Sequence, residues 1–416
     1  MTKKFIIGLS SVVVIGMFAC KQELTTTDTK PTTTVSPNAT ELARQYHYSD
    51  VLVHKGFERF ANLLTTENPT TYSLTQSPTL KEGAKVGIIG VTDPLAKLGR
   101  VLFYDKQLSL NNSVACGSCH HQSQGFADAG QAFSKGHQEG LTTRNSLSIA
   151  NPGMIRAGMF WDRRETTVRD MSLNPVQNHI EMGMESLTLL EAKLSRLDYY
   201  APLFKDAFNG NATITHTKIS DAMTAFLRSM VSWDSRFDQG VKNNFANFTA
   251  EEKRGMEIFN GKNAVATSPF SVPSGACNSC HSAPMFNDGN TVNAYYDVDF
   301  FANVAGGGID IGLDKNPKDK GAKNGGGFKI PSLRNVELTG PYMHDGRFKT
   351  LEDVIEHYNS GVQPSPGLSS RMKDDNGKPK KLGLTDTEKR DLVAFLKTLT
   401  DKTFVTDSKY SDPFTN

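Results

Sequence analysis

Cysteine is scarce in this sequence. Only five occur among 416 residues: Cys20 near the N-terminus, and the pairs Cys116/Cys119 and Cys277/Cys280. Each pair belongs to a C-x-x-C-H motif, so no cysteine is left for a structural disulfide. The length of the chain gives room for two domains with substantial cores.

A surplus of charge of either sign is also missing. Lys and Arg together number 46 and Asp and Glu 44, which gives a formal net charge of +2. Chains that bind nucleic acid usually carry a clear basic surplus. We therefore expect no nucleic-acid partner.

The apolar run near the N-terminus is too short for a transmembrane helix. Residues 5–19 are its 15 members, whereas roughly 20 are needed to cross a bilayer. Lys3 and Lys4 precede the run, so residues 1–20 are typical of a signal peptide. Ala19-Cys20 resembles a bacterial lipoprotein cleavage site, and an ordinary secretory signal is the alternative. Because Cys20 has no other role, we favour export to the periplasm with a lipid anchor at Cys20.

Strand signals are few, so the predicted fold class is mostly α. Residues 94–103, 186–208, 216–231 and 250–259 have helical spacing of apolar residues, and a capping box at Thr385-x-x-Glu388 begins a helix that ends at Leu399. The same spacing over residues 41–64 predicts an extra N-terminal helix. The glycine-rich segment 306–327 predicts a long functional loop.

The two C-x-x-C-H motifs carry the chemistry. They span residues 116–120 and 277–281, and each ends in a histidine, His120 or His281. This pattern is the attachment signature of c-type haem: two thiols form thioethers to the porphyrin, and the adjacent histidine ligates the iron. A zinc site would have to join knuckles about 160 residues apart, far beyond the usual spacing. A thioredoxin-like motif should lie near a βαβ pattern, and none is visible. We infer two covalent haems.

These features divide the chain into six parts. They are a signal peptide (1–20), a polar tether (21–40), an N-terminal helical extension (41–90), a first cytochrome c-like haem domain (91–245), a second one (246–405) and a C-terminal tail (406–416).

The two haem halves resemble each other outside the haem motifs. Gly99-x-x-Leu102-Phe103 and Gly255-x-x-Ile258-Phe259 precede the first and second motifs. The stretch 161–170 agrees with 344–353 at five positions, four of them identical and one with valine opposite leucine, all at one constant offset in numbering. We interpret the halves as an internal duplication, and we expect equivalent positions to face equivalent sides of the two haems.

Further short motifs occur in a fixed order between residues 90 and 400. They are Gly136-His137, Arg144-Asn145-Ser146, Phe160-Trp161-Asp162, Asn174-Pro175, Glu181-Met182-Gly183, the segment 341–346 (PYMHDG) and Thr350-Leu351-Glu352. With the haem motifs, this order resembles the bacterial di-haem cytochrome c peroxidases and the related MauG-type enzymes. The tether and the N-terminal extension lie outside the resemblance.

The resemblance implies a role for each haem. His120 would ligate the peroxidatic haem, which reacts with hydrogen peroxide, and His281 the electron-transfer haem. Glu181 matches the distal acid, which can move a proton between the peroxide oxygens. Trp161 matches a tryptophan that relays an oxidising equivalent between the haems. The alternatives are a surface glutamate for Glu181 and core packing for Trp161.

A calcium site is also implied by the resemblance. Its ligands would be Asn145 with the backbone oxygens of Thr339 and Pro341. Oxygen donors of this kind suit Ca²⁺, and water would complete the shell.

Two positions distinguish the branches of the family. The peroxidases proper place a methionine fourteen residues after the histidine of H-D-G, and this chain has Tyr358 there, as MauG-type enzymes do. Tyr358 as the sixth ligand of the second haem would lower its potential, whereas a thioether would raise it. Met343 and Met372 are the alternatives, but methionine is more often core filler.

His137, in contrast, favours the branch of the peroxidases proper. It matches a loop histidine that caps the first haem iron in resting peroxidases and that MauG-type enzymes generally lack. Its spacing from His120 is one residue longer than in the peroxidases, and a flexible surface histidine is an equal alternative. His121 and His357 are assigned structural or surface roles.

Three functions follow from this reading. The first is reduction of hydrogen peroxide at the first haem, with electrons from a small cytochrome c or cupredoxin that enter through the second haem in a transient encounter. The second is oxidation of a partner protein's side chains through a high-valent di-haem state, which Tyr358 favours. The third is a non-enzymatic electron carrier, against which Glu181 and Trp161 argue. The membrane is a partner only through the lipid anchor, and a homodimer is a candidate assembly.

Overall fold

The structure is a computed structural model that describes residues 35–55, 57, 61–65, 81–155, 158–161, 163–261, 277–283, 285–287, 328–364 and 368–415. The chain divides into two units, Met1–Ser36 and Pro37–Asn416, and the second is the subject below. The predicted signal peptide, most of the tether and the loop at 306–327 lie outside the described residues. Across the described part of the chain, no helix combines the length and the apolar character needed to cross a membrane.

The described chain is mostly helical with very little sheet. Its α-helices are α1 (Ala39–Ala43), α2 (Asn62–Thr65), α3 (Asp93–Tyr104), α4 (Val168–Met171), α5 (Asn174–Gln177), α6 (Leu187–Leu194), α7 (Tyr200–Ala207), α8 (His216–Ser229), α9 (Arg236–Lys242), α10 (Ala250–Phe259), α12 (Leu351–Glu356) and α13 (Asp386–Lys397). A π-helix, His357–Gly361, continues α12. Strands β1 (Asp50–Leu52) and β2 (Lys85–Gly87) pair antiparallel, with Val51 opposite Val86. The predicted fold class is confirmed.

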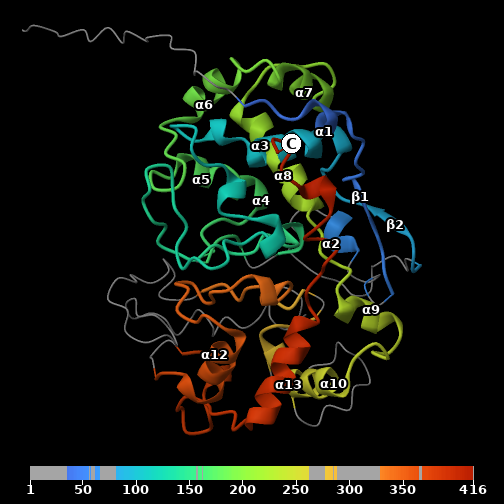
Figure 1. Ribbon diagram of the computed structural model, residues 1–416, viewed down its shortest axis with the longest axis vertical. Helices are drawn as coiled ribbons and strands as arrows, with labels where there is room; N and C mark the ends of the chain where they lie inside the picture. The colour runs from blue at the N-terminus through green and yellow to red at the C-terminus, as the bar shows by residue number, and fades with distance from the viewer. Residues whose placement is uncertain are drawn as a thin grey trace, which may run out of the picture. The chain divides into compact units, whose positions relative to one another are not determined.

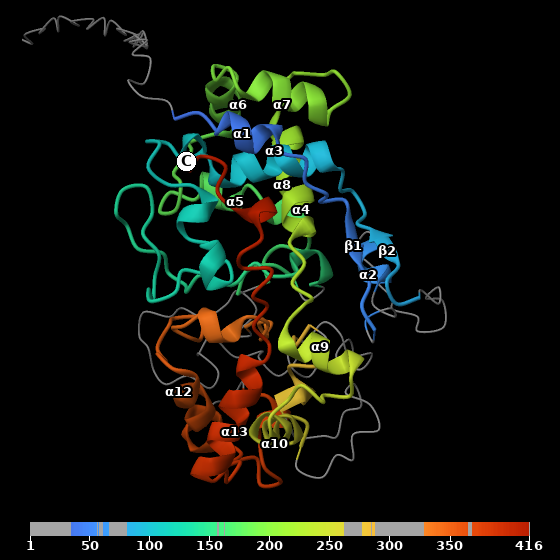
Figure 2. The same ribbon diagram turned by 45° about the vertical axis from the view of Figure 1, so that its right-hand side comes forward.

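One helix crossing forms the centre of each half. Helix α3 packs on α8 in the first half, and α10 packs on α13 in the second (Figure 1), and both pairs remain side by side in the rotated view (Figure 2). A glycine marks each contact. A Cβ added to Gly99 would lie 2.0 Å from the carbonyl oxygen of Ala222, and one added to Gly255 would lie 2.0 Å from that of Asp391. The helices can approach this closely only because both positions lack a side chain.

Several backbone features of the first half are repeated in the second half at the constant offset in numbering found in the sequence. The bridge between Met159 and Glu165 has its counterpart in the bridge between Tyr342 and Phe348, with an N–H···O distance of 2.7 Å in each. The positive φ of Phe160 (65°) is repeated at Met343 (72°). The threonines that cap α4 and α12 are related by the same offset. These matches support the duplication, which is an interpretation of ancestry.

Two of the predicted helices are wrong in extent. Residues 41–64 do not form one helix: they contain the end of α1, strand β1 and part of α2. At the end of β1, Leu52 is exposed although it is apolar, and the next residue, Val53, is buried, so one helical face does not continue through this segment. Residues 186–208 form α6 and α7 with a break at 195–199. Pro202 explains the break, because proline is tolerated only in the first turn of a helix. The predictions for α3, α8, α10 and α13 are confirmed to within two residues.

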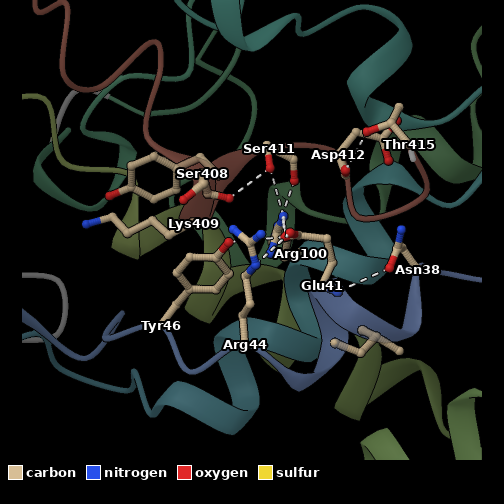
Figure 3. A network of polar contacts seen from close by, with 12 residues as sticks. Asn38, Glu41, Arg44, Tyr46, Arg100, Ser408, Lys409, Ser411, Asp412 and Thr415 are labelled. Carbon is tan, nitrogen blue, oxygen red and sulfur yellow. Dashed lines mark hydrogen bonds and ion pairs between the residues drawn. The ribbon is translucent and has the colours of Figure 1, made fainter.

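The C-terminal segment, residues 401–415, returns from the second half to the first. The Arg100 guanidinium on α3, which is buried, donates to the backbone oxygen of Ser411 at 2.6 Å and to the Glu41 carboxylate at 3.0 Å (Figure 3). The backbone N–H of Asn38 donates to the carbonyl oxygen of Pro413 at 2.7 Å. The N-terminal extension, α3 and the C-terminal segment are therefore joined around one buried cation.

A second buried cation joins the halves. Arg334 lies in the second half, near its haem motif, and pairs with Asp238 on α9 through two N–H···O contacts of 2.8 Å. Both side chains are fully buried. Loss of one partner from such a pair leaves an uncompensated charge, which costs about 3–5 kcal/mol.

Candidate functional site

The first C-x-x-C-H motif forms a tight turn. Residues Cys116–Ser118 make one 3₁₀ turn, and the Ser118 hydroxyl accepts the N–H of Ala115 at 3.0 Å. The Tyr104 ring lies against Gly117, where an added Cβ would meet it at 2.5 Å. All four motif cysteines are free thiols, and burial raises the pKa of Cys116 to about 12 and that of Cys277 to about 11. Half-buried thiols with no disulfide partner fit covalent attachment.

Both motif histidines have their Nδ1 atoms engaged by backbone. The Nδ1 of His120 lies 2.8 Å from the carbonyl oxygen of Phe126, and the Nδ1 of His281 lies 3.1 Å from the carbonyl oxygens of Phe286 and Pro331. Burial lowers the pKa of both imidazoles, to about 4 for His281. A neutral imidazole that donates from Nδ1 presents Nε2 as a metal ligand, which is the usual arrangement for a ligating histidine. The residues therefore fit haem iron at both sites.

Asn178 organises the loop that carries Glu181. Its side-chain oxygen accepts the N–H of Ile180 at 2.9 Å, and its amide nitrogen donates to the Glu181 carboxylate at 2.9 Å. The N–H groups of Met182 and Gly183 both donate to the Asn178 carbonyl. The loop therefore wraps around one side chain, and this fixes the direction of the carboxylate.

The Glu181 carboxylate lies near the first haem motif. Burial raises the pKa of Glu181 above 4.5, and the Arg164 guanidinium counteracts part of that rise. The charge of Glu181 in turn contributes to the raised pKa of Cys116 and of Cys119. A half-buried carboxyl of raised pKa beside an attachment site is suited to accept and donate a proton. The role of Glu181 as the distal acid remains a prediction.

His137 is buried and adjoins the same loop. The residue is only 5% exposed, and its backbone N–H donates to the carbonyl oxygen of Glu181 at 2.9 Å. Its Nδ1 has no hydrogen-bond partner among the described residues. The ring packs on Gly183, where an added Cβ would lie 2.3 Å from it. A flexible surface histidine is therefore excluded, and an imidazole nitrogen remains available beside the Glu181 loop.

Trp161 lies between segments of the two halves. It is 9% exposed, its indole N–H donates to the carbonyl oxygen of Asn145 at 2.8 Å, and its own carbonyl accepts the N–H of Lys329 at 2.8 Å. Its ring meets His344 edge to face at a centroid distance of 6.4 Å. His344 in turn stacks on Phe328 at 4.0 Å. The indole is thus held in one orientation where the halves meet.

The three residues predicted to bind calcium lie in neighbouring segments. The N–H of Asn145 donates to the carbonyl oxygen of His344, and its side-chain nitrogen donates to two carbonyls of the preceding loop. Those donations fix the orientation of the Asn145 amide. Thr339 and Pro341 flank Gly340, whose carbonyl accepts the N–H of Gly130. The donor set suits Ca²⁺, and the site remains a prediction.

Tyr358 is carried by the π-helix that follows α12. Burial raises its pKa above 10.0, and Cys280 and Cys277 add to the rise, so the phenol lies near the second haem motif. The ring meets that of His357 at 5.3 Å, which assigns His357 a packing role. π-helical turns often occur at functional sites. A phenol of raised pKa stays protonated unless a metal displaces the proton, so Tyr358 fits a ferric iron ligand.

A cavity of about 330 Å³ opens beside the π-helix. It is lined by Arg347, Phe348, Asp353, Glu356, His357, Ser360, Gly361 and Gln363. Tyr358 is not among these residues, so the cavity lies next to the second haem site and outside its ligand set.

The sequence analysis did not predict the roles of three residues of the site. Asn178 shapes the Glu181 loop, Arg164 opposes the rise in the pKa of Glu181, and Ser146 donates to the Cys119 carbonyl at 2.7 Å with His120 Nδ1 at 3.3 Å. Asn178 had a signal, since asparagine three residues before an acid at a turn is a common loop anchor. The roles of Arg164 and Ser146 depend on tertiary contacts, which the spacing of residues in the sequence does not reveal.

Two C-x-x-C-H turns on one mostly helical chain, each with a neutral histidine held by backbone carbonyls, define a di-haem c-type protein. Comparison with known proteins gives the family. Residues 93–246 match the family model described as di-haem cytochrome c peroxidase. The chain belongs to this family of di-haem cytochrome c peroxidases and MauG proteins, and it is a di-haem oxidoreductase with haem c cofactors.

Individual relatives agree with this assignment. The chain is 32% identical over 309 residues to the methylamine utilization protein MauG of Methylorubrum extorquens, which covers 74% of this chain and 79% of that protein. It is 29% identical over 267 residues to cytochrome c551 peroxidase of Nitrosomonas europaea, which covers 63% of this chain and 72% of that protein.

Solved structures give the same fold. A MauG-like protein associated with microbial copper homeostasis matches with a TM-score of 0.62 and 32% identity, over 78% of this chain and 94% of that one. The di-haem peroxidase BthA of Burkholderia thailandensis matches with a TM-score of 0.60 over 78% of this chain and 91% of that one; its 23% identity supports the fold alone.

Proposed function

We propose that the protein reduces hydrogen peroxide to water at the first haem, with electrons that enter through the second haem. The observation that carries this proposal is an asymmetry between the two sites. The first motif has a half-buried carboxyl of raised pKa beside it, Glu181, whereas the second has a phenol, Tyr358. A reactive iron needs a proton carrier, and an electron-transfer iron needs a permanent ligand.

Each residue has one task in this proposal. Bound haem would pass on the two electrons that the donor protein supplies, and it would provide the metal that polarises the peroxide. Glu181 takes the proton from one peroxide oxygen and returns it to the other, so that water can leave. Asn178 orients that carboxyl, and Trp161 provides an oxidisable ring between the halves. His137 would supply a nitrogen that ligates the first iron at rest and that must leave, upon reduction, before peroxide binds.

The surroundings of the enzyme complete the proposal. The reductant is a small cytochrome c or cupredoxin, and Ca²⁺ binds Asn145 with the backbone oxygens of Thr339 and Pro341. Export to the periplasm with a lipid anchor at Cys20 brings the protein to the compartment of such donors.

A second function is favoured by Tyr358. An anionic oxygen ligand stabilises high oxidation states of iron, so the second haem could lose an electron instead of only passing one on. The reaction would then be oxidation of a partner protein's side chains, and peroxide would be the oxidant.

A spectroscopic redox titration of the holoprotein, followed by peroxide addition to each redox state, tests both proposed functions. Peroxide reduction with a donor predicts that turnover begins after one electron has been added, with His137 leaving the iron. Side-chain oxidation predicts that the fully oxidised protein reacts and that both haems change. A protein whose haems never react with peroxide would contradict both functions.

A further inference from the structure

A strongly basic turn lies in the second half. Residues 371–381, the basic hairpin, contain Arg371, four lysines and only two acidic residues, a net charge of +3 where the whole chain has +2. The four lysines are Lys373, Lys378, Lys380 and Lys381. This charge is concentrated in eleven residues that the structure describes.

The basic hairpin has a defined shape. The N–H of Lys380 donates to the Met372 carbonyl at 2.7 Å, and the N–H of Asp374 donates to the Lys378 carbonyl at 2.8 Å. The Asp374 carboxylate accepts the N–H groups of Asn376 and Lys378, each at 2.9 Å. One of the two acidic side chains is therefore engaged in closing the turn, and the turn presents its lysines in a fixed arrangement.

Both ends of the hairpin are tied to the second haem site. At the first end, the Arg371 guanidinium donates to the carbonyl oxygen of Ser279, inside the C-x-x-C-H motif. Just past the second end, the N–H groups of Leu382 and Leu384 donate to the backbone and side-chain oxygens of Asn359, at 3.0 and 2.8 Å. Asn359 directly follows Tyr358 on the π-helix. The hairpin thus connects the two elements that would face the second haem.

The hairpin lysines are not neutralised by their described neighbours. No ion pair joins Lys373, Lys378, Lys380 or Lys381 to a carboxylate of the described residues, and Lys378 and Lys381 are exposed. Lys389 on α13 differs, since its ammonium contacts the carboxylates of Glu356 and Asp386, each at 2.8 Å. Charges that a fold leaves available on one face are suited to an oppositely charged partner.

We propose that the basic hairpin is the docking surface for the acidic face of a small one-electron donor protein. The proposal rests on the proposed function, in which electrons enter through the second haem. Each encounter passes one electron from the donor's reduced cofactor to the second haem. Two encounters supply two electrons, which with two protons convert one H₂O₂ into two H₂O. Arg371 and Asn359 position the hairpin, and Lys378 and Lys381 attract the partner.

The test follows peroxide-driven oxidation of reduced plastocyanin, an acidic cupredoxin, by the holoprotein at several salt concentrations. We expect kcat/KM to fall as salt is added, because salt screens the attraction. In the double variant Lys378→Glu/Lys381→Glu we expect kcat/KM at low salt to be about tenfold or more below that of the unmodified protein. The matched control is Lys205→Glu/Lys402→Glu, which makes the same charge change at exposed lysines on α7 and in the C-terminal segment.

Each outcome decides the proposal. If the salt series on the unmodified protein is flat, or if the two double variants lose the same activity, the hairpin is not the docking surface. If phosphatidylglycerol vesicles bind the unmodified protein more than phosphatidylcholine vesicles, and the hairpin variant loses that preference while oxidising plastocyanin normally, the hairpin binds a membrane surface instead. Failure of the proposed function is distinct: the unmodified protein would then show no peroxide turnover even with hydroquinone, an uncharged donor.

Discussion

Trp161 and His344 hold equivalent positions in the two halves, and their rings contact each other edge to face. The contact is flanked by two backbone hydrogen bonds of 2.8 Å that run between the same segments, from Asn145 to His344 and from Lys329 to Trp161. The halves therefore meet around a local, approximate two-fold relation. An indole on one side faces an imidazole on the other, so the two sides differ at this contact.

The first prediction concerns that indole. Trp161→Phe should retain both haems but slow electron transfer between them, because a phenyl ring is much harder to oxidise and cannot donate to Asn145. Stopped-flow absorbance after peroxide addition measures the rate at which the second haem is oxidised. The chain provides a matched control, since its other tryptophan, Trp233, is also buried. If Trp161→Phe and Trp233→Phe react alike, the relay role of Trp161 is wrong.

The second prediction concerns the acid. Glu181→Gln should keep both haems and lower peroxide turnover by about 10²–10⁴-fold, the usual contribution of a positioned proton carrier. The pKa of Glu181 is raised above 4.5 by burial, and the ionised form must accept the first proton. Turnover in the unmodified protein should therefore decline as the pH falls through that raised pKa, and Gln should abolish the decline.

Glu185→Gln is the control, because Glu185 is an exposed neighbour of the same loop. Unchanged turnover in Glu181→Gln would eliminate the assigned role.

The third prediction concerns the second haem. Tyr358→Met should raise its reduction potential and change its absorption spectrum, because a neutral thioether replaces an anionic oxygen. Tyr358→Phe should remove the ligand without supplying another. Potentiometric titration followed by absorbance measures both, and Tyr342→Phe, which loses a hydroxyl that only donates to the Val336 carbonyl, is the control. A spectrum and a potential that do not move would show that Tyr358 is not the ligand.

The fourth prediction concerns the resting state of the first haem. His137 is buried with an unpartnered Nδ1 among the described residues, so we expect it to ligate the oxidised iron. His137→Ala should then give an open first haem that reacts with peroxide without prior reduction, as electron paramagnetic resonance of the resting protein would report. His121→Ala removes an imidazole near Asp128 and should change nothing. Identical resonance spectra for the His137 variant and the unmodified protein would refute ligation.

The fifth prediction compares the two helix crossings. Gly99→Ala and Gly255→Ala each place a methyl group 2.0 Å from a carbonyl oxygen, and each should lower the free energy of unfolding by about 1–3 kcal/mol. Gly87→Ala is the control, because nothing lies within 4 Å of its added Cβ. Urea unfolding measures all three. If the two halves are related, the loss of unfolding free energy should be similar for Gly99→Ala and Gly255→Ala. If either substitution leaves the free energy of unfolding unchanged, the helices do not pack closely at that glycine.

Sequence reasoning succeeded where a motif or a cap is local. The haem turns, the capping box at Thr385 and helices α3 and α10 follow from neighbouring residues, and the structure contains them. Sequence reasoning failed where tertiary contacts determine the local conformation or the role of a residue. Residues 41–64 have helical spacing of apolar residues, but the Asp93 carboxylate binds the N–H groups of Tyr48 and Ser49 and holds the chain extended there. The roles of Asn178 and Ser146 likewise depend on partners brought close by folding.

The return of the C-terminal segment has a consequence for maturation. Phe404 packs on Phe126, whose carbonyl accepts the hydrogen bond from His120, and the Gln122 side chain donates to the carbonyls of Phe404 and Asp407. The backing of the first proximal histidine is thus supplied by residues translated after both attachment motifs. The surroundings of His120 are therefore complete only when residues from the far end of the chain have folded onto them.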